Sequence, residues 1–350
     1  MKKYFLYLLL PFLLVSCGVM HNLPVSETPN QSIKPNKTYS FVDQNGNFYP
    51  DNWRTEYGSP SKKGKIKEFS LMKLATDKSK EVNLQASEKA KIERVGANTN
   101  AKQRVFIFVH GFNASYSKAS QSYDYIKSLL NTSVSKDEII NFYWDGLVAK
   151  SMFGAGKIWF NATNNSQMAG EFGLRRLLNS IKNKDVYIIS HSRGASVVLS
   201  ALSNPPFSKS EIKDRKEDHN IDIDEDSKNL KENGNRIYAI MLAPAIGTKD
   251  FKSEELKDGV DQYRTFTPQL KKAHITINNT DPMLKKMFGF LSDKLKPTDL
   301  GYKEDAFNDL VNHYPFLEKT DFTGQKSHDF DRYIRNPKFI SILKEFKIAK

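Results

Sequence analysis

The sequence has 350 residues, a formal net charge of +13, 39% hydrophobic residues and a single cysteine. This length allows one large domain or two ordinary ones, and the apolar content is sufficient for a sizeable core. A single cysteine excludes a disulfide within the chain. The basic residues are scattered and form no nucleic-acid-binding module, so we expect a solvated basic surface and no nucleic-acid partner, with attraction to anionic membranes as the other interpretation.

The N-terminus has the pattern of a bacterial lipoprotein signal. Lys2 and Lys3 precede an apolar run over residues 4–15, which is too short to span a bilayer and is typical of a signal peptide. The run ends in Leu-Val-Ser-Cys-Gly, which resembles the sequence at which lipoproteins are cleaved before a cysteine that is then acylated. We therefore expect a signal peptide over residues 1–16, a lipid anchor on Cys17, and a protein held in the bacterial cell envelope facing the periplasm.

Three further segments differ in composition from the rest of the chain. Residues 17–60 are rich in Asn, Pro, Ser and Thr, and are expected to form a tether that passes into irregular or short-strand structure. Residues 62–95 are dense in charge, which predicts early strands and a loop without chemistry. A second charged run lies within an insertion over about residues 205–235 and is expected to be solvated. We expect one domain over residues 61–350, with its organised core from about residue 103.

From residue 103 onward the pattern predicts strands that alternate with helices. The helices expected from apolar residues at three- and four-residue spacing, or from composition, cover residues 119–130, 174–181 and 195–202. The strands expected from continuous apolar runs, typical of burial on both faces, are residues 104–109, 139–144, 186–189, 236–243 and 273–278. This alternation predicts an α/β fold with a doubly wound, mostly parallel sheet, helices on both faces, and an active site at the carboxyl ends of the strands.

The sharpest turn of the predicted fold lies between the third of these strands and the helix after it. Only Ser190-His191-Ser192-Arg193-Gly194 separates the two elements. So short a reversal strains the central residue and requires small residues two positions before and after it. Ser192 stands at the centre of a G-x-S-x-G pattern in which Ser190 replaces the first glycine, which makes it the candidate nucleophile. The alternative is that Ser192 caps the following helix.

Two further motifs end the neighbouring strands. His110-Gly111-Phe112-Asn113 follows the strand at 104–109, and Phe142-Tyr143-Trp144 ends the next strand. Together with the serine turn, these motifs make residues 103–340 resemble the α/β-hydrolase superfamily. Within it, the chain is similar to a little-characterised bacterial group that pairs H-G-F-N with a later F-x-W strand. The resemblance implies the α/β-hydrolase fold and acyl-transfer chemistry, and it says little about the substrate.

Acyl transfer requires hydrogen-bond donors aimed at the oxygen that becomes negative in the tetrahedral intermediate. The backbone N–H of Arg193, directly after the nucleophile, is one candidate. The resemblance implies that the N–H of Phe112 is the second, and Gly111 would let this backbone approach the substrate. His110 is expected to brace the loop rather than act as the base, because it precedes Ser192 in the chain and matches the family's loop histidine.

The order Ser, acid, His of this fold places the general base late in the chain. Among the histidines after Ser192, His219 lies in the charged insertion and His274 lies inside a predicted strand. His313 and His328 therefore remain as candidates. His328 is favoured, because it stands in a loop that leads into a helix, as does the catalytic histidine of the resembled family.

Two acids lie beyond strand ends between the nucleophile and the base. Asp281 comes directly off a predicted strand, and Pro282 stiffens the turn that presents it. Asp250 follows its strand only after a longer connection, so its side chain would be less firmly positioned. Asp281 is therefore predicted to complete the triad with Ser192 and His328. Asp281 can also cap the helix expected to start at Pro282, and the two roles are compatible.

The predicted function is that of a lipid-anchored serine hydrolase that cleaves an ester or another activated acyl compound, without a metal or an organic cofactor. The alternative is a non-catalytic envelope lipoprotein that uses the fold as a binding module. The apolar residues over 148–160 are candidates to line the substrate pocket, and plain core packing is an equal alternative. The expected partners are a small acyl substrate and the membrane reached through Cys17.

Overall fold

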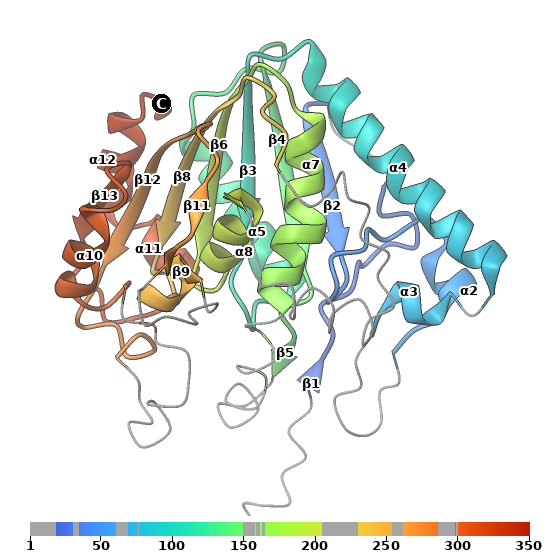
Figure 1. Cartoon of the computed structure of the whole chain (residues 1–350), viewed down its shortest axis with the longest axis horizontal. Helices are drawn as coiled ribbons and strands as arrows, with labels where there is room; N and C mark the ends of the chain where they lie inside the picture. The colour runs from blue at the N-terminus through green and yellow to red at the C-terminus, as the bar shows by residue number, and fades with distance from the viewer. Residues whose placement is uncertain are drawn as a thin grey trace, which may run out of the picture.

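A sheet of seven parallel strands runs through the centre of the molecule (Figure 1). The computed structural model describes residues 19–30, 35–60, 69–75, 77–149, 158, 162, 165–204, 230–253, 262–285, 298 and 300–350. The strand order is β13-β12-β8-β6-β3-β4-β2. In chain order these strands are β2 (Lys37–Val42), β3 (Arg104–Val109), β4 (Asp137–Trp144), β6 (Asp185–His191), β8 (Arg236–Leu242), β12 (Leu270–Ile277) and β13 (Leu317–Asp321). The predicted parallel α/β sheet is thereby confirmed. Strand β13 was not expected from the sequence, and β2 lies in the segment for which only irregular or short-strand structure was expected.

Both faces of this sheet are buried. In β3, Val105, Ile107 and Val109 pack into the core on one face, and Phe106 and Phe108 pack into the core on the other. A strand covered on both sides buries every side chain, whichever way it points. This is why the central strands are encoded as continuous apolar runs rather than as alternating ones.

Helices cover each face of the sheet. The first face is covered by a π-helix η1 (Ala169–Leu174) that continues into α7 (Arg175–Ser180), and by α8 (Gly194–Leu202) and α10 (Glu304–Val311). The second face is covered by α5 (Tyr116–Leu129), α11 (Phe330–Ile334) and α12 (Pro337–Glu345). Figure 1 shows α7 and α8 in front of the sheet and α5 behind it. The helices predicted after β3, before β6 and after the serine turn are all present.

The N-terminal part of the chain is more ordered than its composition suggested. It contains α2 (Trp53–Tyr57), α3 (Leu71–Leu74) and the long helix α4 (Lys78–Asn100). The strands expected over residues 62–95 are therefore wrong where the structure describes this range. The segment is rich in Lys and Glu and contains several Ala, all of which favour helix, but its few apolar residues gave no clear period. Helix α4 is held in place by contacts with α7, which the sequence pattern could not show. One of them is the ion pair between Glu88 of α4 and Arg176 of α7, at 3.2 Å.

The boundary predicted at residue 61 also differs from the structure. Strand β2 lies before it and pairs in parallel with β4 along its whole length, so the main sheet begins within the segment expected to be a tether. Three of the buried residues of β2, Lys37, Thr38 and Ser40, are polar. The sequence therefore has no run of apolar residues from which this strand could be predicted. Its place in the sheet comes from main-chain hydrogen bonds to a distant strand.

Shorter elements complete the described part of the chain. They are β1 (Val19–Met20) paired with β5 (Val148–Ala149), β7 (Ser203–Asn204) paired with β11 (Thr265–Phe266), β9 (Lys252–Ser253) paired with β10 (Gln262–Tyr263), and the short helix η3 (Thr248–Phe251). Cys17 lies outside the described residues, as do most of the apolar segment 148–160 and most of the insertion at 205–235. Within the described ranges, no helix combines the length and the apolar character that crossing a bilayer requires.

The direction of the strand connections reverses between β3 and β6. From β3 the chain moves outward to β4, returns across β3 to β6, and then continues outward through β8, β12 and β13. At such a reversal the connecting helices leave on opposite faces of the sheet and open a crevice at the carboxyl ends of the strands. His110 follows the last residue of β3 and Ser192 follows the last residue of β6. The two motifs singled out in the sequence therefore meet at this crevice.

Candidate active site

Ser192 occupies the strained centre of the turn between β6 and α8. Its φ is 53°, in the left-handed region that residues other than glycine rarely adopt. Two hydrogen bonds from the β8 side hold this conformation: the Ser192 N–H donates to the Leu242 oxygen at 2.9 Å, and the Ala245 N–H donates to the Ser192 oxygen at 3.1 Å. The N-cap of α8 is Arg193, and no side chain caps this helix end. The Ser192 hydroxyl therefore does not cap α8, and its hydrogen-bond partner lies elsewhere.

Two glycines allow the turn to pack tightly against the loop after β3. A Cβ atom on Gly194 would lie 2.5 Å from the main-chain oxygen of His110 and 2.9 Å from that of Val109. A Cβ atom on Gly111 would lie 2.8 Å from the Ser192 Cβ. Neither position has room for a side chain. These contacts explain why glycine stands at both positions and place the loop at 110–113 directly beside Ser192.

The hydroxyl of Ser192 faces His328. The His328 Nε2 atom lies 2.7 Å from the Ser192 Oγ, and its Nδ1 atom lies 2.8 Å from the Asp281 Oδ2. The carboxylate can only accept, so Nδ1 carries the proton and Nε2 is left to accept the hydrogen bond of the serine. The structure thus brings together the three residues predicted for the triad, although Asp281 and Ser192 lie far from His328 in the sequence.

Asp281 is fully buried in the turn that follows β12. Its Oδ1 accepts from the N–H groups of Met283 and Leu284 at 3.0 and 3.2 Å, so the carboxylate also caps the turn that starts at Pro282. Burial opposes ionisation of this carboxyl group. The hydrogen bonds from His328, Tyr333 and the main chain outweigh burial and lower the pKa of Asp281 below its usual 3.8. Asp281 is therefore an anion at neutral pH.

Tyr333 is a member of this site that the sequence did not reveal. Its hydroxyl donates to the Asp281 Oδ2 at 2.8 Å and accepts from the Asn278 Nδ2 at 2.7 Å. The same Asn278 amide also donates to the main-chain oxygen of Gln325 at 2.7 Å, in the loop that carries His328. This network ties the acid to the loop of the base. The only sequence feature that could have indicated Tyr333 is its position, one turn into the helix that follows the loop of His328.

His191, directly before the nucleophile, was also missed as a site residue. Its Nε2 atom donates to the main-chain oxygen of His328 at 2.8 Å, and its ring stacks on Phe330 with a centroid distance of 4.7 Å. Burial, together with the neighbouring His328, holds the pKa of His191 well below its usual 6.5. His191 is therefore a neutral donor that contacts the backbone of the histidine loop rather than the reacting groups.

The side chain of Arg193 anchors the residue whose backbone N–H is the first candidate oxyanion donor. Its buried guanidinium donates to the Ala245 oxygen at 2.8 Å, to the Asp250 Oδ1 at 3.4 Å and to the Ser166 hydroxyl at 3.2 Å. Asp250, the other acid considered from the sequence, thus pairs with Arg193 and has no contact with His328. These bonds fix the start of α8 from three directions.

Phe112, the second candidate oxyanion donor, lies in the loop that packs against Ser192. Asn113, the residue after Phe112, binds this loop to β5 and to the turn before β5. The Asn113 N–H donates to the Leu147 oxygen at 3.1 Å, and the Asn113 Oδ1 accepts from the Ala149 N–H at 2.7 Å. The Phe112 backbone is therefore held in a defined position near the nucleophile, as a preorganised donor requires.

His110 braces the same loop, as the sequence suggested. Its Nδ1–H donates to the Gly111 oxygen at 2.7 Å, and its Nε2 accepts from the Trp144 N–H at 3.2 Å. The Trp144 indole N–H donates in turn to the His110 oxygen at 2.8 Å. Burial lowers the pKa of His110 to about 4, so it is neutral at pH 7. These bonds explain why the H-G-F-N and F-x-W motifs occur together.

Two further histidines, His313 and His274, make no contact with the triad. His313 is exposed and stacks on Tyr263 at a centroid distance of 3.7 Å. His274 lies in β12 with its Nε2 atom 2.7 Å from the Thr320 hydroxyl. The Nδ1 side of His274 faces Glu318 and Glu345, whose carboxylates are bridged by the Lys272 ammonium at 2.7 and 2.9 Å. His219 lies outside the described residues.

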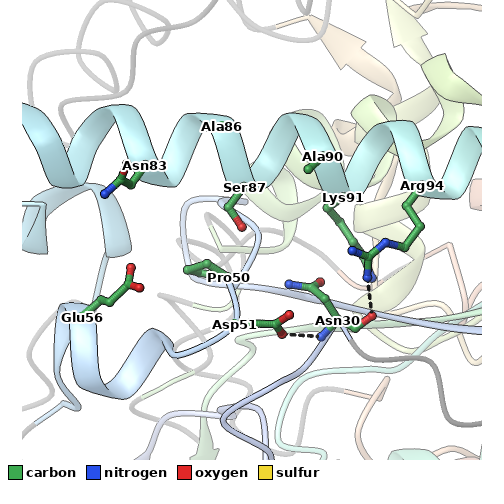
Figure 2. Close-up of a pocket in the computed structure, with 10 residues that line it drawn as sticks. All are labelled: Asn30, Pro50, Asp51, Glu56, Asn83, Ala86, Ser87, Ala90, Lys91 and Arg94. Atoms are coloured by element: carbon green, nitrogen blue, oxygen red, sulfur yellow. Dashed lines mark hydrogen bonds between the residues drawn. The ribbon is translucent and has the colours of Figure 1, made fainter.

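A separate polar cavity of about 330 Å³ lies between α4 and the segment around Pro50 (Figure 2). Two acids, Asp51 and Glu56, and two bases, Lys91 and Arg94, line it. Burial lowers the pKa of Lys91 to about 7, and Arg94 donates to a main-chain oxygen of the cavity wall at 2.8 Å. All of its lining residues come from the N-terminal third of the chain, so this cavity is distinct from the crevice that holds Ser192.

Comparison with known proteins agrees with the fold. The model of a family described as alpha/beta hydrolase of unknown function (DUF900) matches residues 85–294, which is more than half of the chain. The match includes the serine turn, the loop at 110–113 and Asp281. A search of the curated proteins finds no match. The seven-stranded parallel sheet and its helices are consistent with the same fold. The chain therefore belongs to the alpha/beta hydrolase family of unknown function (DUF900).

Proposed function

We propose that this protein is a lipid-anchored serine hydrolase that cleaves an ester or a related acyl compound through Ser192, His328 and Asp281. The observation that carries the proposal is the unbroken chain of hydrogen bonds from the Ser192 Oγ to His328 at 2.7 Å and from His328 to Asp281 at 2.8 Å. A nucleophile, a base and a group that orients the base are the three parts that acyl transfer requires. The family supports hydrolase chemistry on this fold.

In the first half of the proposed reaction, the Ser192 Oγ attacks the acyl carbon of the substrate while the His328 Nε2 takes its proton. The carbonyl oxygen becomes an anion in the tetrahedral intermediate, where the N–H groups of Phe112 and Arg193 would stabilise it. The carbon–oxygen bond to the alcohol then breaks, and His328 returns the proton to the departing alcohol. Asp281 holds the imidazole in the required tautomer and stabilises its charged form.

In the second half, a water molecule attacks the acyl group on Ser192, and His328 takes a proton from this water. The bond to the Ser192 Oγ breaks, the carboxylic acid leaves, and the proton returns to the serine. The N-terminus of α8 also points at this region, so its dipole favours the negative charge of the intermediates. No step calls for a redox change or for a group beyond the substrate and water.

The first experiment is labelling with a fluorophosphonate probe. We expect the wild-type protein to be labelled and Ser192→Ala to be unlabelled. Ser196→Ala is the matched control, because Ser196 is equally buried and lies in the first turn of α8, four residues after Ser192. It should be labelled like the wild type. If the wild type is not labelled and does not hydrolyse p-nitrophenyl esters, the protein is better described as a non-catalytic envelope lipoprotein that uses the fold to bind a ligand.

The anchor is tested independently of catalysis. If Cys17 is acylated, Cys17→Ser should remain an uncleaved precursor and should not incorporate labelled palmitate. The wild-type protein should incorporate it and should fractionate with the cell envelope. Incorporation of palmitate by Cys17→Ser would exclude this site of lipidation.

A further inference from the structure

The first described residues of the chain are docked at the end of the molecule that holds the active site. Strand β1 pairs with β5, and the neighbouring residues bind the loop after β4. The His21 Nδ1 atom lies 2.6 Å from the Asp145 Oδ2, and the Asn22 N–H donates to the Asp145 Oδ1 at 2.8 Å. Figure 1 shows β1 and β5 at the same end of the molecule as the carboxyl ends of the central strands.

This docked segment reaches the machinery around the nucleophile. The Asn22 side-chain nitrogen lies 3.4 Å from the His110 Nε2 and 3.4 Å from the main-chain oxygen of Trp144. The residue after His110 is Gly111, whose backbone packs against Ser192. One asparagine side chain and one loop therefore separate the N-terminal segment from Ser192.

Covalent geometry extends this observation to the proposed anchor. Cys17 precedes Val19 by two residues in the sequence. Consecutive Cα atoms are about 3.8 Å apart, so the Cα atoms of these two residues are separated by at most about 7.6 Å. A lipid on Cys17 would therefore hold the carboxyl end of the sheet close to the bilayer. This differs from the long tether that the composition of residues 17–60 suggested.

Resting on the function proposed above, we infer that the carboxyl end of the sheet faces the bilayer and that the substrate is an acyl lipid embedded in that bilayer. Ser192 would take the fatty acyl group of a lipid ester, the lipid alcohol would leave with the proton from His328, and water would release the fatty acid. A site on a long flexible tether would meet soluble and membrane-embedded esters alike, whereas a docked site meets mainly the lipids beneath it.

Several exposed residues of this end have the chemistry of a membrane interface, beside two exposed carboxylates, Asp321 and Asp329. Met20, next to the anchor, is 48% exposed, and Met283, next to the buried acid, is 41% exposed. Two exposed lysines lie close in sequence to triad residues: Lys285 follows Asp281 by four residues, and Lys326 precedes His328 by two. Apolar side chains that enter the headgroup region, with cations that pair with anionic lipids, are typical of proteins that rest on a bilayer.

The first test changes the length of the connection to the anchor. A flexible Gly-Ser linker of about 20 residues, with a root-mean-square span of about 25 Å, is inserted between Gly18 and Val19. The matched control carries the same linker after Lys350, at the opposite end of the molecule (Figure 1). Each lipidated protein is assayed on a fluorogenic phospholipid ester in vesicles of phosphatidylethanolamine and phosphatidylglycerol, and on soluble p-nitrophenyl acetate.

We expect the N-terminal linker to lower the rate on the vesicle ester several-fold and to leave the rate on the soluble ester unchanged. The C-terminal linker should change neither rate. An unchanged rate on the vesicle ester with the N-terminal linker would overturn the inference. If no form hydrolyses the soluble ester, the proposed hydrolase function itself fails, so the two failures are distinguishable.

The second test measures orientation without relying on activity. Cys17 is the only cysteine in the sequence and would carry the lipid, so one added cysteine can be labelled with a fluorophore. Met283→Cys places the label at the carboxyl end of the sheet. Val134→Cys places it at the opposite end, just before β4, on a residue that is 59% exposed. Brominated phospholipids should quench the label at position 283 and not at 134, and equal quenching would refute the orientation.

Discussion

The His191 Nε2 atom lies 2.8 Å from the main-chain oxygen of His328, so the residue before the proposed nucleophile holds the loop that carries the proposed base. His191 ends β6, which lies in the middle of the seven-stranded sheet. The loop at 322–329 contains no helix or strand. It is connected to the ends of the strands by this bond, by Asn278, and by the Phe322 N–H, which donates to the Ile277 oxygen at 2.7 Å, among others. Ser192 and His328 are therefore positioned from a common rigid strand.

Replacing His191 by phenylalanine should lower kcat. His191→Phe retains an aromatic ring against Phe330 but loses the donor to the His328 oxygen, and a neutral hydrogen bond of about 1 kcal/mol corresponds to roughly a fivefold effect. KM should change little, because His191 does not contact the reacting groups. His191→Gln is the matched variant, since its amide N–H can donate in the same place, and it should recover most of kcat on a p-nitrophenyl ester. A normal kcat in His191→Phe would show that the loop does not need this bond.

Asp281→Asn should abolish most turnover while leaving the protein folded. The side-chain oxygen of the substituted asparagine can still accept from the two main-chain N–H groups of the turn, so the protein should fold. Its Tm should be lowered, because the charged oxygen that accepts from Tyr333 and His328 is lost. The amide cannot hold His328 in the required tautomer or stabilise its charged form, and the loss in kcat is expected to be on the order of 10⁴-fold. Steady-state kinetics and thermal unfolding measured on one preparation test this prediction. Full activity would remove Asp281 from the triad.

Asp250→Asn is the matched acid variant, and its expected effect is on stability. Asp250 pairs with the buried Arg193, so its neutralisation leaves a buried cation without its counter-charge. Breaking a buried ion pair costs about 3–5 kcal/mol, which urea unfolding would detect. The folded fraction should retain turnover, because Asp250 does not contact His328. A severe loss of kcat without a loss of stability would contradict this assignment.

Tyr333→Phe should cost more stability than an ordinary tyrosine hydroxyl. The Tyr333 hydroxyl donates to the Asp281 carboxylate, and a hydrogen bond to a charged group contributes about 1.5–3 kcal/mol. Tyr314→Phe is the control, because its hydroxyl donates only to neutral main-chain oxygens, of Phe251 and Arg264, and should cost about 1 kcal/mol. Urea unfolding at pH 7 compares the two variants. Equal losses would mean that the Tyr333 bond does not sense the charge of Asp281.

His110 should make the protein sensitive to acid. Its pKa is about 4 in the folded protein against 6.5 in a free chain, so between these values the unfolded chain binds a proton that the folded chain does not. The free energy of unfolding should therefore fall as the pH drops from 6.5 to about 4, with about 3 kcal/mol from this group. His110→Gln should show a shallower fall in urea titrations at several pH values. His313→Gln, at an exposed site, should keep the wild-type slope, and identical slopes in all three proteins would exclude His110 as the cause.

The central strands and the serine turn could be predicted from local sequence. A strand buried on both faces must be apolar at every position, as in residues 104–109, and this leaves a pattern that is readable without knowing its neighbours. The turn is similarly local, because five residues between a strand and a helix demand small side chains around Ser192. The histidine loop was recognisable through its order in the chain. Helix α4 and strand β2 were not, since their burial depends on contacts with α7 and β4.

The sequence favoured Asp281 over Asp250 because its turn is shorter and stiffened by Pro282, but only the arrangement of the strands brings that turn beside His328. Both acids follow strand ends, and nothing near either residue says which strand lies beside the loop of His328. That loop comes off β13, whose neighbour in the sheet is β12, and Asp281 follows β12. Asp250 follows β8, one strand further away, and meets Arg193 instead. The docking of His21 on Asp145 is of the same kind. Such pairs join residues more than a hundred positions apart or on different strands, and sequence periodicity reports which side chains are buried but not which of them meet.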